Sequence, residues 1–400
     1  MFIKIFTYIF FSFNLIAQPF IPGNSYFGKN NYTEYIAGSL PIIISAPHGG
    51  DLNPSTIPDR TCNNPTTVRD SYTQELIREI DSACMEIFKC HPHIIICLLD
   101  RKKIDANRDL NDGTCGNPYA IEAWNDYHNF INIAKNKINA DYQKGFYIDL
   151  HGHGHAIQRL ELGYLFSKTE LQYSDSVLNL PNYVNRSSIK NLVSTNKNNF
   201  THSQLLRGDF SLGSILVKNN YPSVPSKTIP FPLASEDYFS GGYNTSVHSS
   251  FSGGAIDAVQ IECNYAGVRD NATSRKNFAR ALVLSMKEYF LKHYFIESDF
   301  NKCTGSNGIF ENESHGTVLE QVYPNPTNGK FTVIFKQNSH EKTNLIIYNL
   351  LGQEVLKRNF TSTQVTLNLP QSSPQGIYFL VIRQGEKIET KKLIVSFNQH

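Results

Sequence analysis

Apolar runs alternate with amphipathic stretches over residues 22–300. Leu40 to Ala46 is a continuous apolar run, which is typical of a strand buried on both faces of a sheet. Residues 70–88 instead place their apolar side chains at helical spacing. By the same criteria we expect further strands at 94–99, 145–150 and 256–261, and further helices at 119–140 and 272–292. This alternation predicts an α/β domain whose mostly parallel or mixed sheet is sandwiched by helices.

The pattern changes after residue 300. Residues 300–318 are polar and rich in Gly, Ser and Asn, as is usual for a linker. Beyond them, short alternating segments separated by turn residues occur at 330–335, 344–348, 364–369, 377–382 and 391–395. Short strands at such regular spacing predict a small all-β sandwich over residues 319–400.

The first 18 residues have the features of a signal peptide. Lys4 precedes an apolar stretch that ends at the small residue Ala17, and Pro19 ends any continuing helix. After this segment, no apolar run is long enough to span a bilayer. We therefore expect a signal peptide, the α/β domain, a linker and a β-sandwich, with bounds at 1–18, 19–299, 300–318 and 319–400.

Composition and charge indicate which classes of partner and which cellular compartment to expect. The formal net charge is only +2 and charged residues form no long block, so we expect no nucleic acid partner. The chain has seven cysteines, and export to an oxidising compartment permits disulfides between them. Cys62 and Cys115 lie in polar loops rich in Gly, Pro and Asn, and we expect them to pair.

Polar clusters follow each of the predicted strands of the α/β domain. The clusters are Ser45-Ala-Pro-His48-Gly-Gly-Asp51, Asp100 to Arg108, Asp149-Leu-His151-Gly-His153-Gly-His155 and Glu262-Cys-Asn264. Because ligands bind beyond the carboxyl ends of the strands in sheets of this kind, the four clusters predict one active site.

The residue types in these clusters indicate a metal-dependent hydrolase. A catalytic zinc site needs about three protein ligands and an open position. His48 and His151 are candidates for two ligands, and either Asp51 or Asp70 for the third. Glu262 ends an apolar strand and is the candidate general base for water.

A guanidinium group is needed for an oxyanion or for a substrate carboxylate. Arg108 is the leading candidate, followed by Arg101 and Arg159.

Several motifs together resemble the N-formylglutamate amidohydrolase family over about residues 40–270. They are Ser45-Ala-Pro-His-Gly-Gly50, Ile57-Pro-Asp-Arg60, Arg69-Asp70-x-x-Thr73, Arg101-x-x-Ile-Asp-x-Asn-Arg108, Trp124-x-x-Tyr127-His128, Asp149-Leu-His-Gly-His153 and Gln260-Ile-Glu-x-Asn264. The resemblance implies a fold similar to the zinc carboxypeptidases and one zinc ion that serves amide hydrolysis.

The same resemblance assigns roles to individual residues. It implies His48, Asp70 and His151 as ligands, Glu262 as the base and Arg108 as the group that binds or polarises the substrate. The remaining candidates for substrate binding are Arg101, Asn107 and Arg159.

The C-terminal segment resembles the sorting domain of the type IX secretion system. The motifs are Val322-Tyr-Pro-Asn-Pro-Thr-Asn-Gly-Lys-Phe-Thr-Val333, Ile347-Tyr-Asn-Leu-Leu-Gly-Gln-Glu-Val355 and Gly376-Ile-Tyr-Phe-Leu-Val-Ile382. This resemblance implies a Bacteroidota-type envelope, the type IX machinery as a partner, and a chain that is secreted or displayed at the cell surface.

The sequence thus predicts a secreted zinc amidohydrolase acting on an N-acyl, N-formyl-like amino acid or a short peptide. Two alternatives stay open: a secreted metallocarboxypeptidase-like peptidase, and a catalytically inactive surface module that binds peptide or glycan.

Overall fold

The chain folds as two compact units, residues 1–304 and 305–400. The computed structural model describes residues 20–300, 319–335, 343–349, 353–370, 372–384 and 387–396. The predicted signal peptide and almost all of the predicted linker lie outside these residues. No helix in the described ranges is long and apolar enough to cross a membrane.

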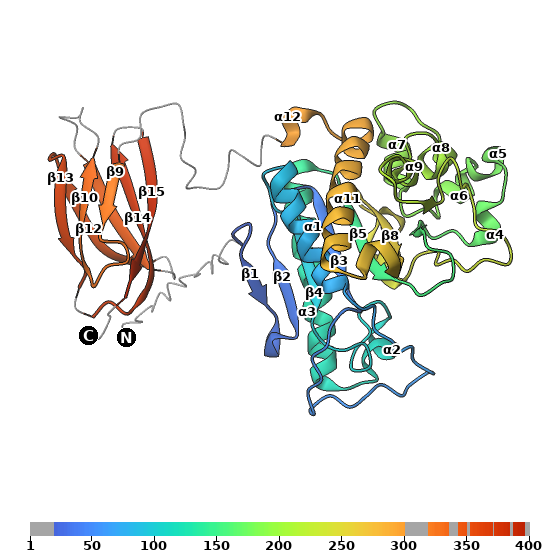
Figure 1. Ribbon diagram of the computed structural model, residues 1–400, viewed down its shortest axis with the longest axis horizontal. Coiled ribbons are helices and arrows are strands. Elements are labelled where there is room, and N and C mark those ends of the chain that lie inside the picture. Colours follow the sequence, from blue (N-terminus) through green and yellow to red (C-terminus); the bar gives the residue numbers. More distant parts are fainter. Residues whose placement is uncertain are drawn as a thin grey trace, which may run out of the picture. The chain divides into compact units, whose positions relative to one another are not determined.

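The larger unit is built on an eight-stranded mixed sheet (Figure 1). Its strands, in spatial order, are β1 (Ser25–Phe27), β2 (Thr33–Ile36), β4 (His93–Cys97), β3 (Ile42–Ala46), β5 (Gly145–Gly152), β8 (Ile256–Cys263), β6 (Leu160–Gly163) and β7 (Ser223–Val224). The four central strands, β4, β3, β5 and β8, run parallel to one another. Antiparallel pairings join β2 to β4 and β6 to β8, so the sheet is mixed, as predicted.

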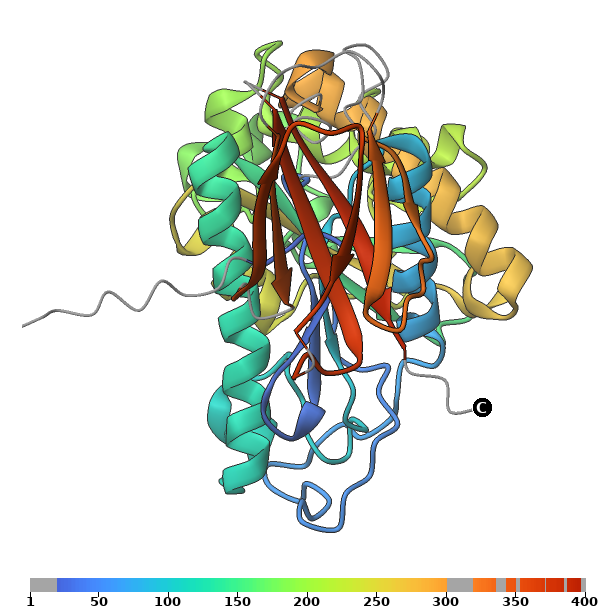
Figure 2. The ribbon, with the colours of Figure 1, turned by 90° about the vertical axis from the view of Figure 1, so that its left-hand side faces the viewer.

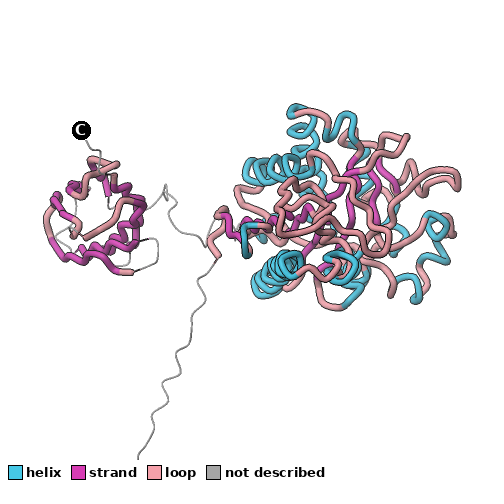
Figure 3. The backbone as a smooth tube through the Cα atoms, turned by 90° about the horizontal axis from the view of Figure 1, so that it is seen from below, coloured by secondary structure: helices cyan, strands magenta, loops and turns pink. Residues whose placement is uncertain are grey.

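Helices cover both faces of this sheet (Figures 2 and 3). One face carries α3 (Pro118–Tyr142), and the other carries α1 (Thr73–Ile87) and α11 (Ala272–His293). Side chains alternate between the faces along each strand, as the pleat requires. In β5, Phe146 and Ile148 pack in the core shared with α1 and α11, whereas Tyr147 packs in the core shared with α3.

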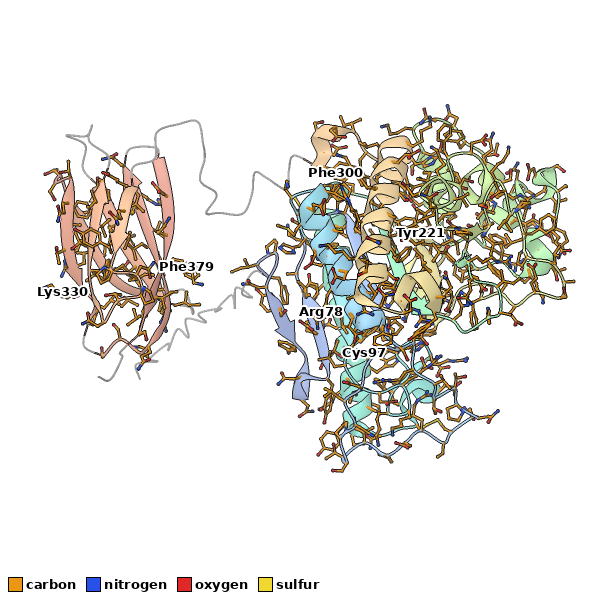
Figure 4. All side chains as sticks on the ribbon, in the orientation of Figure 1. Arg78, Cys97, Tyr221, Phe300, Lys330 and Phe379 are labelled. Atoms are coloured by element: carbon orange, nitrogen blue, oxygen red, sulfur yellow. A yellow bond between two sulfur atoms is a disulfide. The ribbon has the colours of Figure 1, made fainter. Side chains whose placement is uncertain are left out.

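Short helices fill the segment between β6 and β8, at the right of Figure 1. They are α4 (Lys168–Leu171), α5 (Asp175–Leu178), α6 (Pro181–Val184), α7 (Lys190–Thr195), α8 (His202–Arg207), α9 (Leu212–Lys218) and α10 (Tyr243–His248). Tyr221 of this insert packs on Phe278 of α11 with ring centroids 4.9 Å apart (Figure 4).

The loops after β3 and β4 lie beside α2 (Leu110–Thr114) in the lower part of Figure 1. A disulfide joins Cys62 of the first loop to Cys115 at the end of α2, as predicted. The remaining cysteines of the described part of this unit, Cys84, Cys90, Cys97 and Cys263, are buried free thiols.

The last helix in the described part of the larger unit crosses the predicted boundary at residue 299 by one residue. Helix α12 (Glu297–Phe300) ends in Phe300, whose ring packs on Phe88 and Phe295 at centroid distances of 5.0 and 5.6 Å (Figure 4). Phe300 therefore belongs to the core of the larger unit and not to the linker.

The smaller unit is an antiparallel β-sandwich, as predicted. One sheet has the order β13-β10-β9 and the other has the order β12-β11-β14-β15. The strands are β9 (Leu319–Tyr323), β10 (Lys330–Phe335), β11 (Thr343–Asn349), β12 (Glu354–Phe360), β13 (Gln364–Asn368), β14 (Gly376–Gln384) and β15 (Lys387–Val395). Phe331 and Val333 of one sheet share a buried core with Leu345 and Leu380 of the other.

A buried histidine in the large sheet gives a testable pH dependence. The Nδ1 atom of His93 accepts a hydrogen bond from Gly38 N at 3.2 Å and contacts the Tyr35 hydroxyl at 2.8 Å. A backbone N–H can only donate, so this ring atom carries a lone pair and the imidazole is neutral. Burial lowers the pKa of His93 to about 3.

In the unfolded chain His93 has a pKa near its ordinary value, so above about pH 6.5 the imidazole is neutral in both states and the free energy of unfolding has its full value. As the pH falls toward 3, the unfolded chain takes up a proton that the folded chain does not, and this stability is lost. At pH 5 the loss amounts to about 2 kcal/mol. We therefore expect the stability gap between wild type and His93→Gln to shrink by about 2 kcal/mol from pH 7 to pH 5. Urea unfolding at both pH values measures the gap, and a constant gap would contradict the neutral assignment.

Candidate metal centre

Two histidines and one aspartate converge at the carboxyl ends of β3 and β5. His48 follows β3 directly, His151 lies near the end of β5, and Asp70 precedes α1. The Oδ2 atom of Asp70 lies 3.4 Å from Nδ1 of His48 and 3.1 Å from Nδ1 of His151. All three side chains are buried, and their ligand atoms lie within 4.8 Å of one another. The structure thus brings together the three residues that the sequence indicated as ligands.

The opposite nitrogen of each imidazole is held by a carboxylate. Nε2 of His48 lies 2.6 Å from Oδ1 of Asp105, and Nε2 of His151 lies 2.9 Å from Oδ2 of Asp149. A proton on each Nε2, donated to these carboxylates, would leave both Nδ1 atoms to bind a cation beside Asp70. Such carboxylate–histidine pairs are the usual support of a metal-binding imidazole.

These residues fit a divalent metal ion. Nδ1 of His48 is buried and has no hydrogen-bond partner among the described residues. A polar atom buried without a partner is costly, and a cation at this point would satisfy it. Two imidazole nitrogens and one carboxylate are also a ligand set that zinc accepts in catalytic sites.

Backbone and side-chain donors fix the carboxylate of Asp70. Its Oδ2 accepts from Gly152 N at 3.1 Å, and its Oδ1 lies 3.4 Å from Nη1 of Arg101. Asp70 N also donates to His48 O at 3.0 Å, which ties the loop before α1 to the end of β3. Burial disfavours the charged form, but the neighbouring imidazoles of His151 and His48 outweigh it and hold the pKa of Asp70 below its usual range.

Glu262 lies next to this group on the neighbouring strand. It pairs in register with His151 across β5 and β8, and with Glu161 across β6 and β8. Side chains at paired positions point to the same face, so the three groups share one surface. Burial raises the pKa of Glu262 to about 8, and Asp70 and Glu161 add to the rise while His151 opposes it. A carboxyl group with this pKa is mostly protonated at neutral pH, and a cation bound beside it would favour the carboxylate, the form that a general base needs.

The other predicted residues lie at different distances from the cluster. Asp51 is exposed and is not part of the three-residue group, which contains Asp70 instead. Arg101 reaches the cluster, since its Nε also lies 3.2 Å from Oδ2 of Asp105. Arg108 is exposed, and its side chain forms no hydrogen bond or ion pair within residues 20–300. Arg159 is buried and paired with Glu236 at 2.7 Å.

Asn107 positions other groups in this structure. Its Nδ2 lies 3.2 Å from Nε2 of His151, and its Oδ1 accepts from Asn244 N at 2.8 Å. Asn244 belongs to α10 in the insert and also donates to Asp149 at 3.3 Å. The insert therefore contributes to the support of His151.

Asp105, Asp149 and Asn244 received no role from the sequence. A signal was present for Asp149, because it stands two residues before His151 in a strand and so shares its face. Asp105 stands within the Arg101 to Arg108 motif, but its bond to His48 joins two different loops. The position of Asn244 beside Asp149 depends on how the insert packs, which the sequence does not indicate.

Arg269 holds three loops of the site together. Its guanidinium donates to Ser71 O, to His153 O at 3.0 Å and to Cys263 O at 3.1 Å. These carbonyls neighbour Asp70, His151 and Glu262 in sequence. A side chain at Gly152 would collide with this guanidinium, because an added Cβ would lie 2.3 Å from Cζ. Arg269 thus fixes the loops from which the cluster is built.

A second group, His153, His155 and Glu161, is less suited to a metal. Nε2 of His153 lies 2.9 Å from Arg159 O, and its Nδ1 accepts from His155 N at 3.1 Å. Both ring nitrogens of His153 are therefore occupied by contacts within the protein.

A surface hollow of about 320 Å³ lies in the insert and is lined in part by Arg207 and Lys227. None of the residues of the two histidine-containing groups lines it.

Removal of one supporting carboxylate gives a direct test of the cluster. We expect Asp105→Asn to weaken zinc binding by about 10- to 100-fold, because the amide holds the His48 ring with less charge. Competition titration with a chromophoric chelator measures the zinc Kd. Asp59→Asn is the matched control, since Asp59 is exposed and, within residues 20–300, its carboxylate bonds to Lys103 and to no residue of the cluster. Equal zinc Kd values for wild type and Asp105→Asn would contradict the support that we assign to this carboxylate.

Comparisons with known proteins inform the smaller unit. Residues 321–396 match the family described as the secretion system C-terminal sorting domain. No curated protein matches the chain. Among solved structures, the chain is similar to PorZ, an essential bacterial surface component of the type-IX secretion system of Porphyromonas gingivalis. The identity is 18%, the TM-score is 0.17, and the match covers 19% of this chain and 11% of that chain.

These matches lend no support to the resemblance of residues 40–270 to the N-formylglutamate amidohydrolases, which stays a prediction. The family match over residues 321–396 confirms the prediction for the C-terminus and, with it, the type IX machinery as a partner. The chain carries a type IX secretion sorting domain at residues 321–396 and is exported to the cell surface or the extracellular space.

Proposed function

We propose that the larger unit is a zinc-dependent amidohydrolase that cleaves the amide of an N-acyl amino acid or a short peptide. The observation that carries the proposal is the convergence of two imidazole Nδ1 atoms and the Asp70 carboxylate beside Glu262. The finer fold assignment, to the zinc carboxypeptidase-like folds, belongs to the same proposal. It is supported by the position of the cluster at the carboxyl ends of the central parallel strands.

When bound, zinc lowers the pKa of a water molecule to a value near 7 and polarises a carbonyl group. His48, Asp70 and His151 would hold the ion, and Asp105 and Asp149 would orient the two imidazoles. Glu262 takes a proton from the attacking water, whose oxygen bonds to the amide carbon. Glu262 then returns the proton to the amide nitrogen as the C–N bond breaks, which releases a carboxylate and an amine.

The arginines have separate roles in this proposal. Arg101 is held by Asp70 and Asp105 and keeps those carboxylates in place. Arg108 has an exposed guanidinium that makes no hydrogen bond or ion pair in residues 20–300, so it is the group offered to a substrate carboxylate or carbonyl.

The test measures metal content and hydrolysis on the same preparation of the chain. N-formyl and N-acetyl amino acids and dipeptides are supplied, and released amine is detected by fluorescence. We expect amine release that 1,10-phenanthroline abolishes and added zinc restores. Bound zinc without release from any substrate would contradict the hydrolase and favour a surface binding module.

A further inference from the structure

The disulfide between Cys62 and Cys115 joins two segments of the chain that support the metal centre. Cys62 lies in the loop after β3, which leads to the ligand Asp70, and Cys115 lies at the end of α2 (Figure 1). The loop after β4, which leads into α2, carries Asp105, the carboxylate that holds Nε2 of His48. The hydrolytic steps proposed above give this disulfide no role.

Each half of the disulfide lies two residues from a group that holds Asp105. Arg60, two residues before Cys62, places Nη2 3.6 Å from Oδ2 of Asp105. Gly113, two residues before Cys115, accepts a hydrogen bond from Asp105 N at 2.9 Å. An added Cβ at Gly113 would lie 2.5 Å from Asp105 O, so α2 packs directly on this residue. The disulfide therefore joins the two segments between which Asp105 is held.

Arg60 ties its own loop to the loop after β4 and to α2. Its Nη1 donates to Asp112 O at 3.1 Å, and its Nε donates to Arg101 O at 3.1 Å. Arg101 in turn contacts the carboxylates of Asp70 and Asp105. A shift of the loop that carries Arg60 would therefore disturb both carboxylates.

The loop after β3 has few other contacts that could hold it in place. Residues 53–69 contain no helix or strand, and of the side chains in this range only Ile57 and Arg60 are buried. Segments with few buried apolar groups open locally at a low cost in free energy. A cross-link restricts such opening, and its effect grows with the length of chain that it closes, here a sequence separation of 53 residues.

We propose that the Cys62–Cys115 disulfide completes the metal centre, so that the chain binds zinc tightly only after these two cysteines have been oxidised. This inference rests on the proposed function, since it concerns the regulation of the same site. The chain is exported, and thiols stay reduced in the cytoplasm but form disulfides in oxidising compartments. The chain then holds zinc weakly and stays inactive until it leaves the cytoplasm.

The oxidation is a thiol–disulfide exchange with a disulfide reagent of the compartment, written RSSR. One cysteine thiolate attacks RSSR, which forms a mixed disulfide and releases RS⁻. The second thiolate attacks the chain's own sulfur in that mixed disulfide and releases the second RS⁻. The chain loses two electrons and two protons, and RSSR becomes two thiols. Cys62 is half-buried and Cys115 is exposed, so such a reagent can reach them.

The zinc Kd is measured by competition with a chromophoric chelator on the oxidised wild type and on the Cys62→Ser/Cys115→Ser chain. Serine cannot form the disulfide and supplies no thiolate for zinc. We expect the Kd to be about 10- to 100-fold higher in the double variant, which is the effect of losing the support of a metal ligand.

A second preparation covers the case in which the double variant does not fold. The folded wild type is reduced with a phosphine and its accessible thiols are capped with iodoacetamide, and we expect the same rise in the zinc Kd. The oxidised wild type treated with iodoacetamide alone is the matched control and is expected to keep its Kd.

Asp105→Asn tests the route from the disulfide to the metal centre. It is expected to raise the zinc Kd about 10- to 100-fold in the disulfide-bonded chain, but less than about 3-fold in the double variant, where Asp105 is already loosely held. Effects that act independently would instead combine fully. Full additivity of the two changes would contradict the route through Asp105.

Equal zinc Kd values in the oxidised, double-variant and capped chains would overturn the role of the disulfide and leave the metal centre intact. Failure of the proposed function looks different. Zinc binding that depends on the disulfide, without hydrolysis of any substrate, would sustain this inference and contradict the hydrolase. An oxidised wild type that binds no zinc would overturn the metal centre and this inference together.

Discussion

The His151→Ala chain is expected to contain less than about a tenth of an equivalent of zinc and to show no hydrolysis above background. The imidazole of His151 supplies one of the three converging donor atoms, and its Nδ1 lies 3.1 Å from Asp70. Its loss also leaves the Asp149 carboxylate buried without its ring partner. Elemental analysis and the amine-release assay measure both effects on one preparation.

His155→Ala is the matched control for this variant. His155 lies in the same histidine-rich segment, but its Nδ1 contacts Glu161 at 2.8 Å and it is not part of the His48 group. We expect this variant to keep its zinc. A fully metallated and active His151→Ala chain would rule out the cluster as the metal site.

Glu262→Gln is expected to keep its zinc and to lose about 10²- to 10⁴-fold in kcat. The amide preserves the shape of the side chain and its contact with Gln260, which lies 2.9 Å away. It cannot accept a proton from water at neutral pH. Steady-state kinetics and elemental analysis together separate loss of the base from loss of the metal.

Glu161→Gln distinguishes Glu262 from its register partner. Both carboxylates lie on one face of the sheet, but the two oxygens of Glu161 are already bonded to the His155 ring and to Phe239 N. We expect Glu161→Gln to retain more than about a tenth of the wild-type kcat. Wild-type rates in Glu262→Gln would reject the assignment of the base.

The elements of the α/β unit that follow a clear periodicity could be predicted from the sequence. The apolar run that ends at Ala46 became β3, and the helical stripe over 70–88 became α1 at Thr73–Ile87. Strands without such a pattern were not predicted, among them β2, β6 and the two-residue β7. Their pairing depends on contacts with strands remote in sequence, which periodicity does not encode.

The candidate site shows the same division. His48, His151 and Glu262 stand at the ends of apolar runs, where a polar residue is conspicuous in the sequence. The choice between Asp51 and Asp70 could not be made from the spacing alone, because it depends on how the loop after β3 folds back. The structure buries Asp70 against His151 and leaves Asp51 exposed.

The most direct test of the metal centre is the zinc content per chain of wild type, Asp70→Asn and Asp51→Asn, each purified without chelator. The account predicts about one zinc in wild type and in Asp51→Asn, and little in Asp70→Asn. No zinc in the wild type, or equal zinc in all three chains, would contradict the metal centre built from His48, Asp70 and His151.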